Sequence, residues 1–260
     1  MLTPEQKAHF ETFGFLVCPK LFSKQEIQTI KRETEEIFEQ VYGTGWSQPK
    51  ERLSLQPFFE RRPFLAQLAD DDRIYCIAED LLGDDFVLDG TEGHRHVGDT
   101  HWHGGGGSPE VVRSVKIAFY VEPLKKETGC IRFIPGSNCP EFGEKLKMYR
   151  GFQQDPNEMP FGIPGEDVPS VAFEPVIGDV ALFTEHTYHA SFGGRPGRYQ
   201  LAISFFQNPK TEEQVGHIRA QYDRSKWSFR PSKSYINSER PRIRRMVSKL
   251  IELGFKPLDY

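Results

Sequence analysis

The sequence predicts a mainly β fold with helical supports, and three observations indicate it. Candidate helices occupy about residues 3–82 and about 211–253, toward the two ends of the chain. Between them, short runs of β-branched and aromatic residues are separated by turns containing Gly and Pro, which is typical of proteins with many short strands. The 21 phenylalanines among 260 residues suit the interior of such a fold. We expect one domain over residues 1–260.

The N-terminal elements are predicted from their capping residues. Thr3 with Gln6, and Ser23 with Glu26, have the spacing of capping boxes. Pro4 at the first helical position supports the first helix. The expected elements are a helix over 3–12, a strand over 14–18, a helix from Ser23 to about Val41, and a helix over about 64–82 that Gly83 ends.

The strands are predicted from about residue 85 onward, where β-branched and aromatic residues become frequent. The expected strands are 86–88, 114–121, 130–134, 168–173, 180–183, 187–191 and 199–206. The segment 138–167 is rich in Gly, Pro and charged residues, and a loop of this length is often a lid or a binding loop. Helices over about 211–223 and 239–253 complete the set.

Composition restricts the class of protein. The formal net charge of −4 and the pI of about 6.1 argue against a nucleic-acid polymer as the main ligand, because such proteins carry a basic surface. The four cysteines are widely spaced, which fits a reducing cytosol better than a disulfide framework. The N-terminus has no apolar signal core, and no apolar run approaches the roughly 20 residues of a membrane span. We expect a soluble, cytoplasmic protein with no membrane partner.

Histidines provide the first candidate site residues. His94 and His96 alternate along a predicted strand, and they either face a pocket or simply alternate. His101 and His103 also alternate, so we expect them on one face. A His-x-His zinc site is one interpretation, but it needs two more ligands, and the sequence offers no Cys or carboxylate at ligand spacing.

A run of four glycines follows His103 and has two interpretations. It is either a turn between strands, since glycine tolerates positive φ, or part of a metal site. Many non-haem iron enzymes hold Fe(II) with two histidines and one carboxylate, in a His-x-Asp…His pattern. Two positions after His103 the chain has Gly105 instead of a carboxylate. A metal bound here would lack that ligand. The run matches neither common phosphate-binding motif.

His189 and Arg198 lie in the second half of the chain, nine residues apart. A strand that carries histidine, then a tight turn, then an arginine that opens the next strand would set a cation near a metal. The planar guanidinium of arginine matches a carboxylate. A dicarboxylic cosubstrate could therefore chelate the metal at one end and bind Arg198 at the other. The alternatives are a hairpin salt bridge for Arg198 and a solvated turn for Arg195.

Four stretches resemble, in order, the phytanoyl-CoA dioxygenase family. They are FGFLVCPKLFSKQEI, GDTHWHGGGGSP, RSVKIAFYVEPLKKETGCIRFIPGSN and GDVALFTEHTYHASFGGRPGRYQ, and the match spans roughly residues 10–207. The resemblance implies a double-stranded β-helix core and an enzyme that uses Fe(II), 2-oxoglutarate and O2. The implied site residues are His103 and His189 as iron ligands, Arg198 for the distal carboxylate of 2-oxoglutarate, Thr100 as its hydrogen-bond partner, and Lys116 and Arg132 as residues that could reach the site from flanking strands.

The departure at Gly105 changes the reaction that the resemblance implies. Most family members carry Asp at this position, whereas a minority, the non-haem iron halogenases, carry Gly or Ala. In those enzymes chloride occupies the vacated coordination position, and it supplies the negative charge and the ligand that the carboxylate would have supplied. The resemblance therefore implies chlorination of an unactivated C–H bond of a free small molecule in specialised metabolism.

Two other functions remain open. A hydroxylase or desaturase of the same family would complete its metal site with water or with a distant carboxylate such as Asp99 or Glu185. A catalytically silent binding protein would have lost iron, although both histidines and the arginine are present.

A basic, aromatic stretch near the C-terminus bears on the substrate. It comprises Arg219, Tyr222, Arg224, Lys226, Trp227, Phe229, Arg230 and Lys233, followed by Arg240, Arg242, Arg244 and Arg245. One interpretation is a solvated helical face. The other is recognition of a flat, anionic substrate such as a nucleotide, with arginines for phosphate and aromatic rings for stacking.

Overall fold

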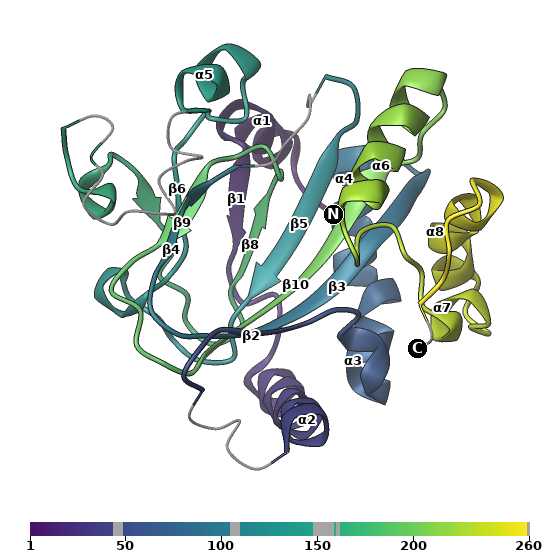
Figure 1. The fold of residues 1–260 in the computed structure, drawn as a ribbon, viewed down its shortest axis with the longest axis horizontal. Coiled ribbons are helices and arrows are strands. Elements are labelled where there is room, and N and C mark those ends of the chain that lie inside the picture. The colour runs from purple at the N-terminus through teal and green to yellow at the C-terminus, as the bar shows by residue number, and fades with distance from the viewer. Residues whose placement is uncertain (44–48, 105–109, 148–158, 160–161, 259–260) are drawn as a thin grey trace.

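The computed structural model describes residues 1–43, 49–104, 110–147, 159 and 162–258. Its centre is a pair of sheets (Figure 1). The strands are β1 (Phe15–Cys18), β2 (Leu53–Leu55), β3 (Phe86–His96), β4 (Thr100–His103), β5 (Ser114–Phe119), β6 (Arg132–Phe133), β7 (Val171–Ala172), β8 (Val180–Phe183), β9 (His189–Ser191) and β10 (Arg198–Gln207).

Within the described residues, the larger sheet has the strand order β1-β8-β5-β10-β3-β2 and the smaller sheet has the order β4-β9-β6-β7. The pairings within both sheets are antiparallel. Strands distant in sequence are therefore neighbours in space, as in β10 between β5 and β3. This arrangement confirms the expected mainly β fold with a double-stranded β-helix core.

Helices cover the larger sheet and flank the core. They are α1 (Pro4–Phe13), α2 (Lys24–Tyr42), α3 (Pro63–Gln67), α4 (Asp72–Leu82), α5 (Pro140–Lys145), α6 (Glu212–Arg224), α7 (Lys233–Ile236) and α8 (Pro241–Glu252). Both expected N-terminal capping boxes form, at Thr3 and at Ser23. Among the residues described, no helix has both the length and the apolar character that crossing a membrane would require.

The single helix expected over about 64–82 is wrong. The chain forms α3, a 3₁₀ turn over Leu68–Asp70, and then α4. Asp71 leaves the helical conformation, and its side chain accepts a hydrogen bond from the backbone N–H of Arg73 at 3.0 Å. An aspartate in this role satisfies a backbone donor that the start of a helix otherwise leaves unpaired. The apolar periodicity continues through the break, so the sequence pattern does not reveal where the helix is interrupted.

Strand β3 is much longer than the expected strand over 86–88, since it continues to His96. Its later residues include glycines and polar side chains that are uncommon in isolated strands. They are held extended because β3 pairs with β10 on one side and with β2 on the other. The expected loop over 138–167 contains α5 and a 3₁₀ turn over Gly165–Asp167. Residues 148–158, 160 and 161 of this segment, which is expected to be a lid or a binding loop, lie outside the described residues.

Alternation along the larger sheet separates two layers. The outward side chains pack against α2, α3 and α4, and examples are Val115, Ile117, Phe119, Leu201, Ile203 and Phe205. The inward side chains of Ala118, Phe183 and Ala202 pack instead with Ile131 and Phe133 of the smaller-sheet side. Figure 1 shows the smaller sheet on one side of this core and α4 behind the larger sheet. The space between the sheets is therefore lined mainly by the inward-facing residues.

Replacing Gly93 with alanine is expected to destabilise the fold. A Cβ built on Gly93 of β3 would lie 2.3 Å from the ring of Phe58, which is fully buried. Because overpacking a core typically costs about 1–3 kcal/mol, we expect the melting temperature to fall by roughly 3–10 °C. Gly90→Ala on the same strand is the matched control, since its Cβ meets nothing within 4 Å. Equal melting temperatures for the two variants would contradict this packing.

Candidate functional site

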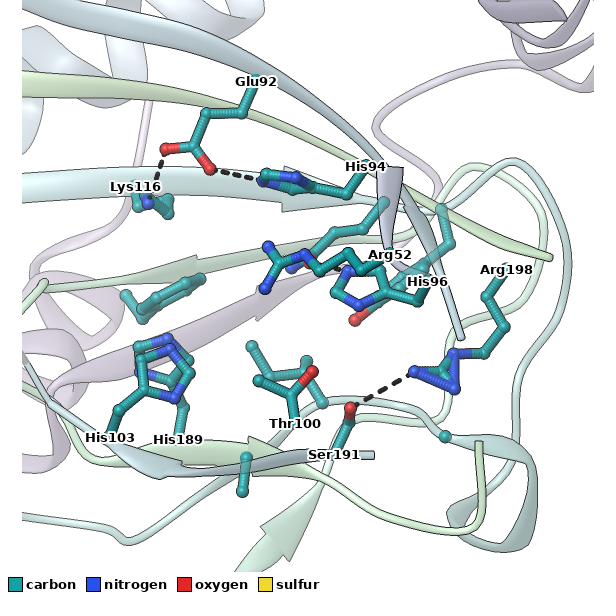
Figure 2. A pocket seen from close by; sticks show the side chains of 16 residues that line it. Arg52, Glu92, His94, His96, Thr100, His103, Lys116, His189, Ser191 and Arg198 are labelled. Carbon is teal, nitrogen blue, oxygen red and sulfur yellow. Dashed lines mark hydrogen bonds and ion pairs between the residues drawn. The ribbon is translucent and has the colours of Figure 1, made fainter. Parts of the chain in front are cut away.

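A cavity lies between the two sheets and is lined mainly by polar side chains. Figure 2 shows the lining side chains that carry the polar and charged groups. They include Arg52, Glu92, His94, His96, Thr100, His103, Lys116, His189, Ser191 and Arg198. Three of the four residues that sequence motifs identify most directly as site residues, His103, His189 and Arg198, are thus brought together from β4, β9 and β10. The fourth, Gly105, lies outside the described residues.

Strands β3 and β10 place their polar residues on the inner face of the larger sheet. In the antiparallel register, His96 lies opposite Arg198, and His94 lies opposite Gln200. Because side chains alternate along a strand, Glu92 joins His94 and His96 on the same face. Of the two interpretations of His94 and His96, the structure supports the one in which both face a pocket.

His103 and His189 face each other across the β4–β9 pair, with ring centroids 4.1 Å apart. Each Nδ1 lies 2.8 Å from a backbone carbonyl oxygen two residues earlier, that of His101 and of Thr187 respectively. A carbonyl oxygen can only accept a hydrogen bond, so each Nδ1 carries the hydrogen and donates it, and each Nε2 keeps a free lone pair. Burial lowers the pKa of both side chains, which favours the neutral form. Two neutral, oriented imidazoles are the form that binds a metal ion.

The expectation that His101 shares a face with His103 is wrong. Three residue steps from Thr100 to His103 on β4 oppose only two steps on β9, so the strand contains a bulge. The bulge places Thr100 and His103 on the cavity side and buries Trp102 in a cluster on the other side of the smaller sheet. The His101 ring lies 6.3 Å from that of Phe192, a member of that cluster. A zinc site that uses both histidines of the His-x-His pattern is not supported.

Arg198 is 1% exposed, and its guanidinium is only partly satisfied. Nη1 and Nη2 donate to the carbonyl oxygen of Gly98 at 3.3 and 3.0 Å, and Nη2 lies 3.4 Å from Oγ of Ser191. The buried Nε has no hydrogen-bond partner among the described residues. A buried guanidinium without an anion is energetically costly, and a carboxylate placed beside it would supply the missing acceptor.

Two glycines make room for this guanidinium. A Cβ on Gly129 would lie 2.2 Å from Nη1 of Arg198, and one on Gly194 would lie 1.7 Å from it. The salt-bridge alternative for Arg198 is not supported, because Arg198 forms no ion pair within the described part of the chain. Its neighbour Arg195 is exposed and pairs with Glu122, so Arg195 belongs to the turn. The close packing around Arg198 therefore positions its guanidinium for a ligand.

Thr100 and Ser191 lie between the histidine pair and Arg198 (Figure 2). The cavity thus presents two imidazole Nε2 atoms at one place and a buried, unsatisfied guanidinium at another, with two hydroxyl groups in between. Iron held by the imidazoles and a 2-oxoglutarate that spans from it to Arg198 would fit this set of donors. The orphaned Nε atom is the observation that carries the fit.

Lys116 lines the cavity but already pairs with two carboxylates. Its Nζ lies 2.8 Å from Oε1 of Glu92 and 3.5 Å from a carboxylate oxygen of Glu185. The other oxygen of Glu92 contacts Nε2 of His94 at 2.8 Å, and Nδ1 of His94 contacts Ser54. The nearby Lys116 ammonium and the His94 hydrogen bond keep the pKa of Glu92 well below its usual range despite burial. Lys116 therefore serves a buried ion-pair network, and a cosubstrate would have to compete with two carboxylates for it.

Arg132 lies away from the cavity, contrary to the expectation that it could reach the site. Its Nη1 donates to the carbonyl oxygen of Glu166 at 2.8 Å, and its Nη2 donates to that of Lys126 at 3.1 Å. The guanidinium also lies over the ring of Phe192. Arg132 thus ties together the loops outside the smaller sheet.

Sequence reasoning missed Arg52 and Gln200, and it did not single out Glu92. Arg52 projects into the cavity from just before β2, and Oε1 of Gln200 contacts Nε2 of His96 at 3.0 Å. The sequence signal for this wall was the alternation of Glu92, His94 and His96, which would have indicated a strand with one polar face. The strand expected over 86–88 stops short of these three residues, so their shared face is not part of that prediction.

The basic C-terminal stretch does not form one phosphate-binding surface. Ion pairs join Arg240 to Asp70, and Arg242 to Asp72. Arg230 lies over the ring of Tyr222 and donates to backbone carbonyls. These contacts fit the interpretation of a helical face that packs and is solvated.

Solved structures share this fold. HygX from Streptomyces hygroscopicus, described with nickel and 2-oxoglutarate bound, is 22% identical, with a TM-score of 0.65 over 81% of this chain and 89% of that chain. The epimerase SnoN, described in complex with Fe3+, α-ketoglutarate and nogalamycin RO, is 17% identical, with a TM-score of 0.58 over 78% and 83%. EctD from S. alaskensis is 20% identical, with a TM-score of 0.60 over 83% and 78%.

A search of curated protein sequences yields no match. The sequence model of the phytanoyl-CoA dioxygenase (PhyH) family matches residues 10–198. That interval begins in α1 and ends at the arginine that opens β10, so it contains both facing histidines and the buried guanidinium. With well over half of its length matched, the chain belongs to the phytanoyl-CoA dioxygenase family.

Proposed function

We propose that the protein is an oxidoreductase that uses Fe(II), 2-oxoglutarate and O2 to oxidise a C–H bond of a small molecule. The observation that carries this proposal is the pairing of two oriented imidazoles with the unsatisfied guanidinium of Arg198 in one cavity. Family membership supports it. HygX binds nickel and 2-oxoglutarate in its crystal structure, and SnoN binds Fe3+ and α-ketoglutarate, which supports the same cofactors here.

In this proposal each side chain has a defined task. His103 and His189 hold iron through Nε2, and Arg198 binds the distal carboxylate of 2-oxoglutarate. Thr100 lines the path between them and offers a hydroxyl to the cosubstrate. Iron and 2-oxoglutarate, when bound, supply the oxidising power that removes hydrogen from the substrate. The buried walls keep bulk water away from the reacting centre.

We further propose that the reaction is chlorination rather than hydroxylation. Gly105 cannot supply the carboxylate that most family members place there, so a chloride ion would provide the missing charge and ligand. The overall reaction balances as R–H, chloride, O2, 2-oxoglutarate and one proton giving R–Cl, succinate, CO2 and water.

The hydroxylase alternative needs another carboxylate or water at the iron. Three candidate carboxylates in the described chain already have other partners. Asp99 accepts a hydrogen bond from the backbone N–H of Gly194, while Glu185 pairs with Lys116. Glu92 lines the cavity but is bound by both Lys116 and His94. Recruiting any of them would break an existing interaction, which disfavours a protein carboxylate as the third ligand and leaves water or chloride for that position.

Product analysis tests the reaction type. Purified protein is supplied with Fe(II), 2-oxoglutarate, O2 and candidate substrates, with and without chloride. We expect a product with the isotope pattern of one chlorine that depends on added chloride. Turnover that ignores halide and yields only hydroxylated product would contradict the chlorination proposal while leaving the broader one intact.

Cofactor binding separates an enzyme from a silent binding protein. We expect Fe(II) and 2-oxoglutarate, added together without O2, to give a visible charge-transfer band. His103→Ala should abolish the band, because it removes one of the two imidazole ligands. His217→Ala is the control, since His217 lies on α6, away from the cavity lining. A protein that gives no band would support the silent alternative.

The small-molecule substrate and the compartment are also proposals. HygX and SnoN are described with hygromycin B and nogalamycin RO bound, which supports a free small molecule from specialised metabolism. All four cysteines of this chain are free thiols, which supports a reducing cytoplasm.

A further inference from the structure

A second cavity adjoins the one that contains the histidine pair, and we call it the acidic chamber. Its volume is about 260 Å³. The charged residues that line it are Glu60, Asp89, Glu92, Glu185, Lys116 and Arg230. Carboxylates thus outnumber cationic groups by four to two within the described lining. Such a chamber suits a ligand that brings positive charge.

The acidic chamber meets the histidine cavity at a shared wall. Glu92 and Lys116 line both cavities. Lys116 lies opposite Phe183 in the β5–β8 register, and the ring of Phe183 lies 4.8 Å from that of His189. Figure 2 shows Lys116 and Arg198 at opposite ends of the histidine cavity. The chamber therefore approaches the histidines from the side that the Arg198-bound cosubstrate would leave open.

Asp89 is a carboxylate of the chamber that lacks a cationic partner within the described residues. The Lys116 ammonium is shared between Glu92 and Glu185, and the guanidinium of Arg230 lies over Tyr222. Asp89 is 8% exposed and forms no ion pair within the described residues. Its Oδ1 accepts the backbone N–H of Phe229 at 3.0 Å, and no described residue donates to its Oδ2.

This isolation is unfavourable for the protein alone. Burial, with the Glu185 carboxylate adding to it, raises the pKa of Asp89 to about 8. A buried carboxyl group that lacks a counter-charge costs folding free energy, and such groups are concentrated at functional sites. With this pKa Asp89 is largely protonated at neutral pH in the free protein, and a bound cation would offset the cost of ionising it by pairing with Oδ2.

The rim of the chamber adds an aromatic surface. Trp227 is 44% exposed and lines the chamber together with Ser225 and Ser228. An exposed indole beside a carboxylate is suited to an organic cation, because the face of the ring attracts positive charge.

We propose that the acidic chamber binds the substrate through a protonated amine that pairs with Asp89, and so presents a nearby C–H bond to the histidine pair. The substrate class is an organic ammonium compound. The inference rests on the proposed function, in which the histidine pair holds the iron. It replaces the nucleotide substrate that the basic C-terminal stretch suggests, because a phosphate in this chamber would lie among four carboxyl groups.

Binding to the purified protein without iron or cosubstrate tests the chamber separately from the reaction. The probes are three ligands of one shape, phenethylamine, phenethyl alcohol and 3-phenylpropionate, together with adenosine 5′-monophosphate. Each is titrated by ligand-detected nuclear magnetic resonance. We expect phenethylamine to bind at least about tenfold more tightly than the alcohol, because a hydrogen bond to a charged group contributes about 1.5–3 kcal/mol. The two anions should not compete with it.

Asp89→Asn is the decisive variant. It keeps an oxygen for the N–H of Phe229 and removes the charge, so we expect phenethylamine affinity to fall about tenfold or more. Asp223→Asn is the matched control, because it removes the same charge from an exposed position on α6. Unchanged amine binding in Asp89→Asn, equal affinity for the alcohol, tighter binding of adenosine 5′-monophosphate, or no amine binding would overturn the inference. Asp89-dependent amine binding in a protein that never chlorinates would uphold it and contradict only the proposed reaction.

Discussion

Replacing Gly105 with aspartate is expected to convert chlorination into hydroxylation. The new carboxylate would supply the third iron ligand of a site with two histidines and one carboxylate, together with the negative charge that chloride otherwise brings. Because one coordination position cannot hold both, we expect the ratio of chlorinated to hydroxylated product to fall by at least about a hundredfold, equivalent to roughly 3 kcal/mol. Mass spectrometry of both products from one reaction measures the ratio directly.

Gly105→Ala is the matched control for this switch. It adds a methyl group and no ligand, so chlorination should continue, with any loss of rate common to both products. If the aspartate variant chlorinated as well as the parent, the explanation based on the missing carboxylate would be wrong. If the parent and the aspartate variant both hydroxylated and neither chlorinated, the protein would be a hydroxylase that completes its iron site without residue 105.

The fold was predictable where local pattern and tertiary environment agree. Residues 180–183 and the capped helices α1 and α2 follow the expected limits closely, because alternation, capping and burial indicate the same structure there. The misses have two causes. The glycines and polar residues of β3 are held in a strand by the distant strands β10 and β2, which a window of neighbouring residues does not contain. The break before α4 depends on a local cap, the side chain of Asp71, and the apolar periodicity that continues through the break conceals it.

The candidate site likewise contains features that the sequence predicts and features that depend on the folded structure. His103, His189 and Arg198, which the sequence motifs and the family resemblance single out, line one cavity. The β4 bulge was not predictable, since it depends on pairing with β9. The space around Arg198 depends on Gly129, about 70 residues away in sequence. Likewise, the isolation of Asp89 is a property of the assembled chamber.

Replacing Arg198 with glutamine is expected to abolish useful affinity for 2-oxoglutarate while leaving iron binding intact. The guanidinium is buried, and its Nε has no acceptor among the described residues, so a bound carboxylate would supply one. Removing one partner of a buried charge pair typically costs about 3–5 kcal/mol, so we expect the Kd of 2-oxoglutarate to rise by at least about a hundredfold. Anaerobic titration of the charge-transfer band measures this Kd. Fe(II) affinity should change little, because the proposed imidazole ligands lie on β4 and β9 and Arg198 lies on β10.

Two further variants distinguish a cosubstrate contact from general damage to the turn. Arg195→Gln removes an exposed guanidinium three residues earlier and should leave the Kd of 2-oxoglutarate unchanged. Gly194→Ala keeps the Arg198 charge but places a Cβ 1.7 Å from its Nη1, so the guanidinium must move. We expect an intermediate loss of about tenfold, since displacement weakens a bidentate interaction without removing it. If Arg198→Gln bound 2-oxoglutarate like the parent, the unsatisfied Nε would have another purpose, and Arg52 would become the candidate cation for the cosubstrate.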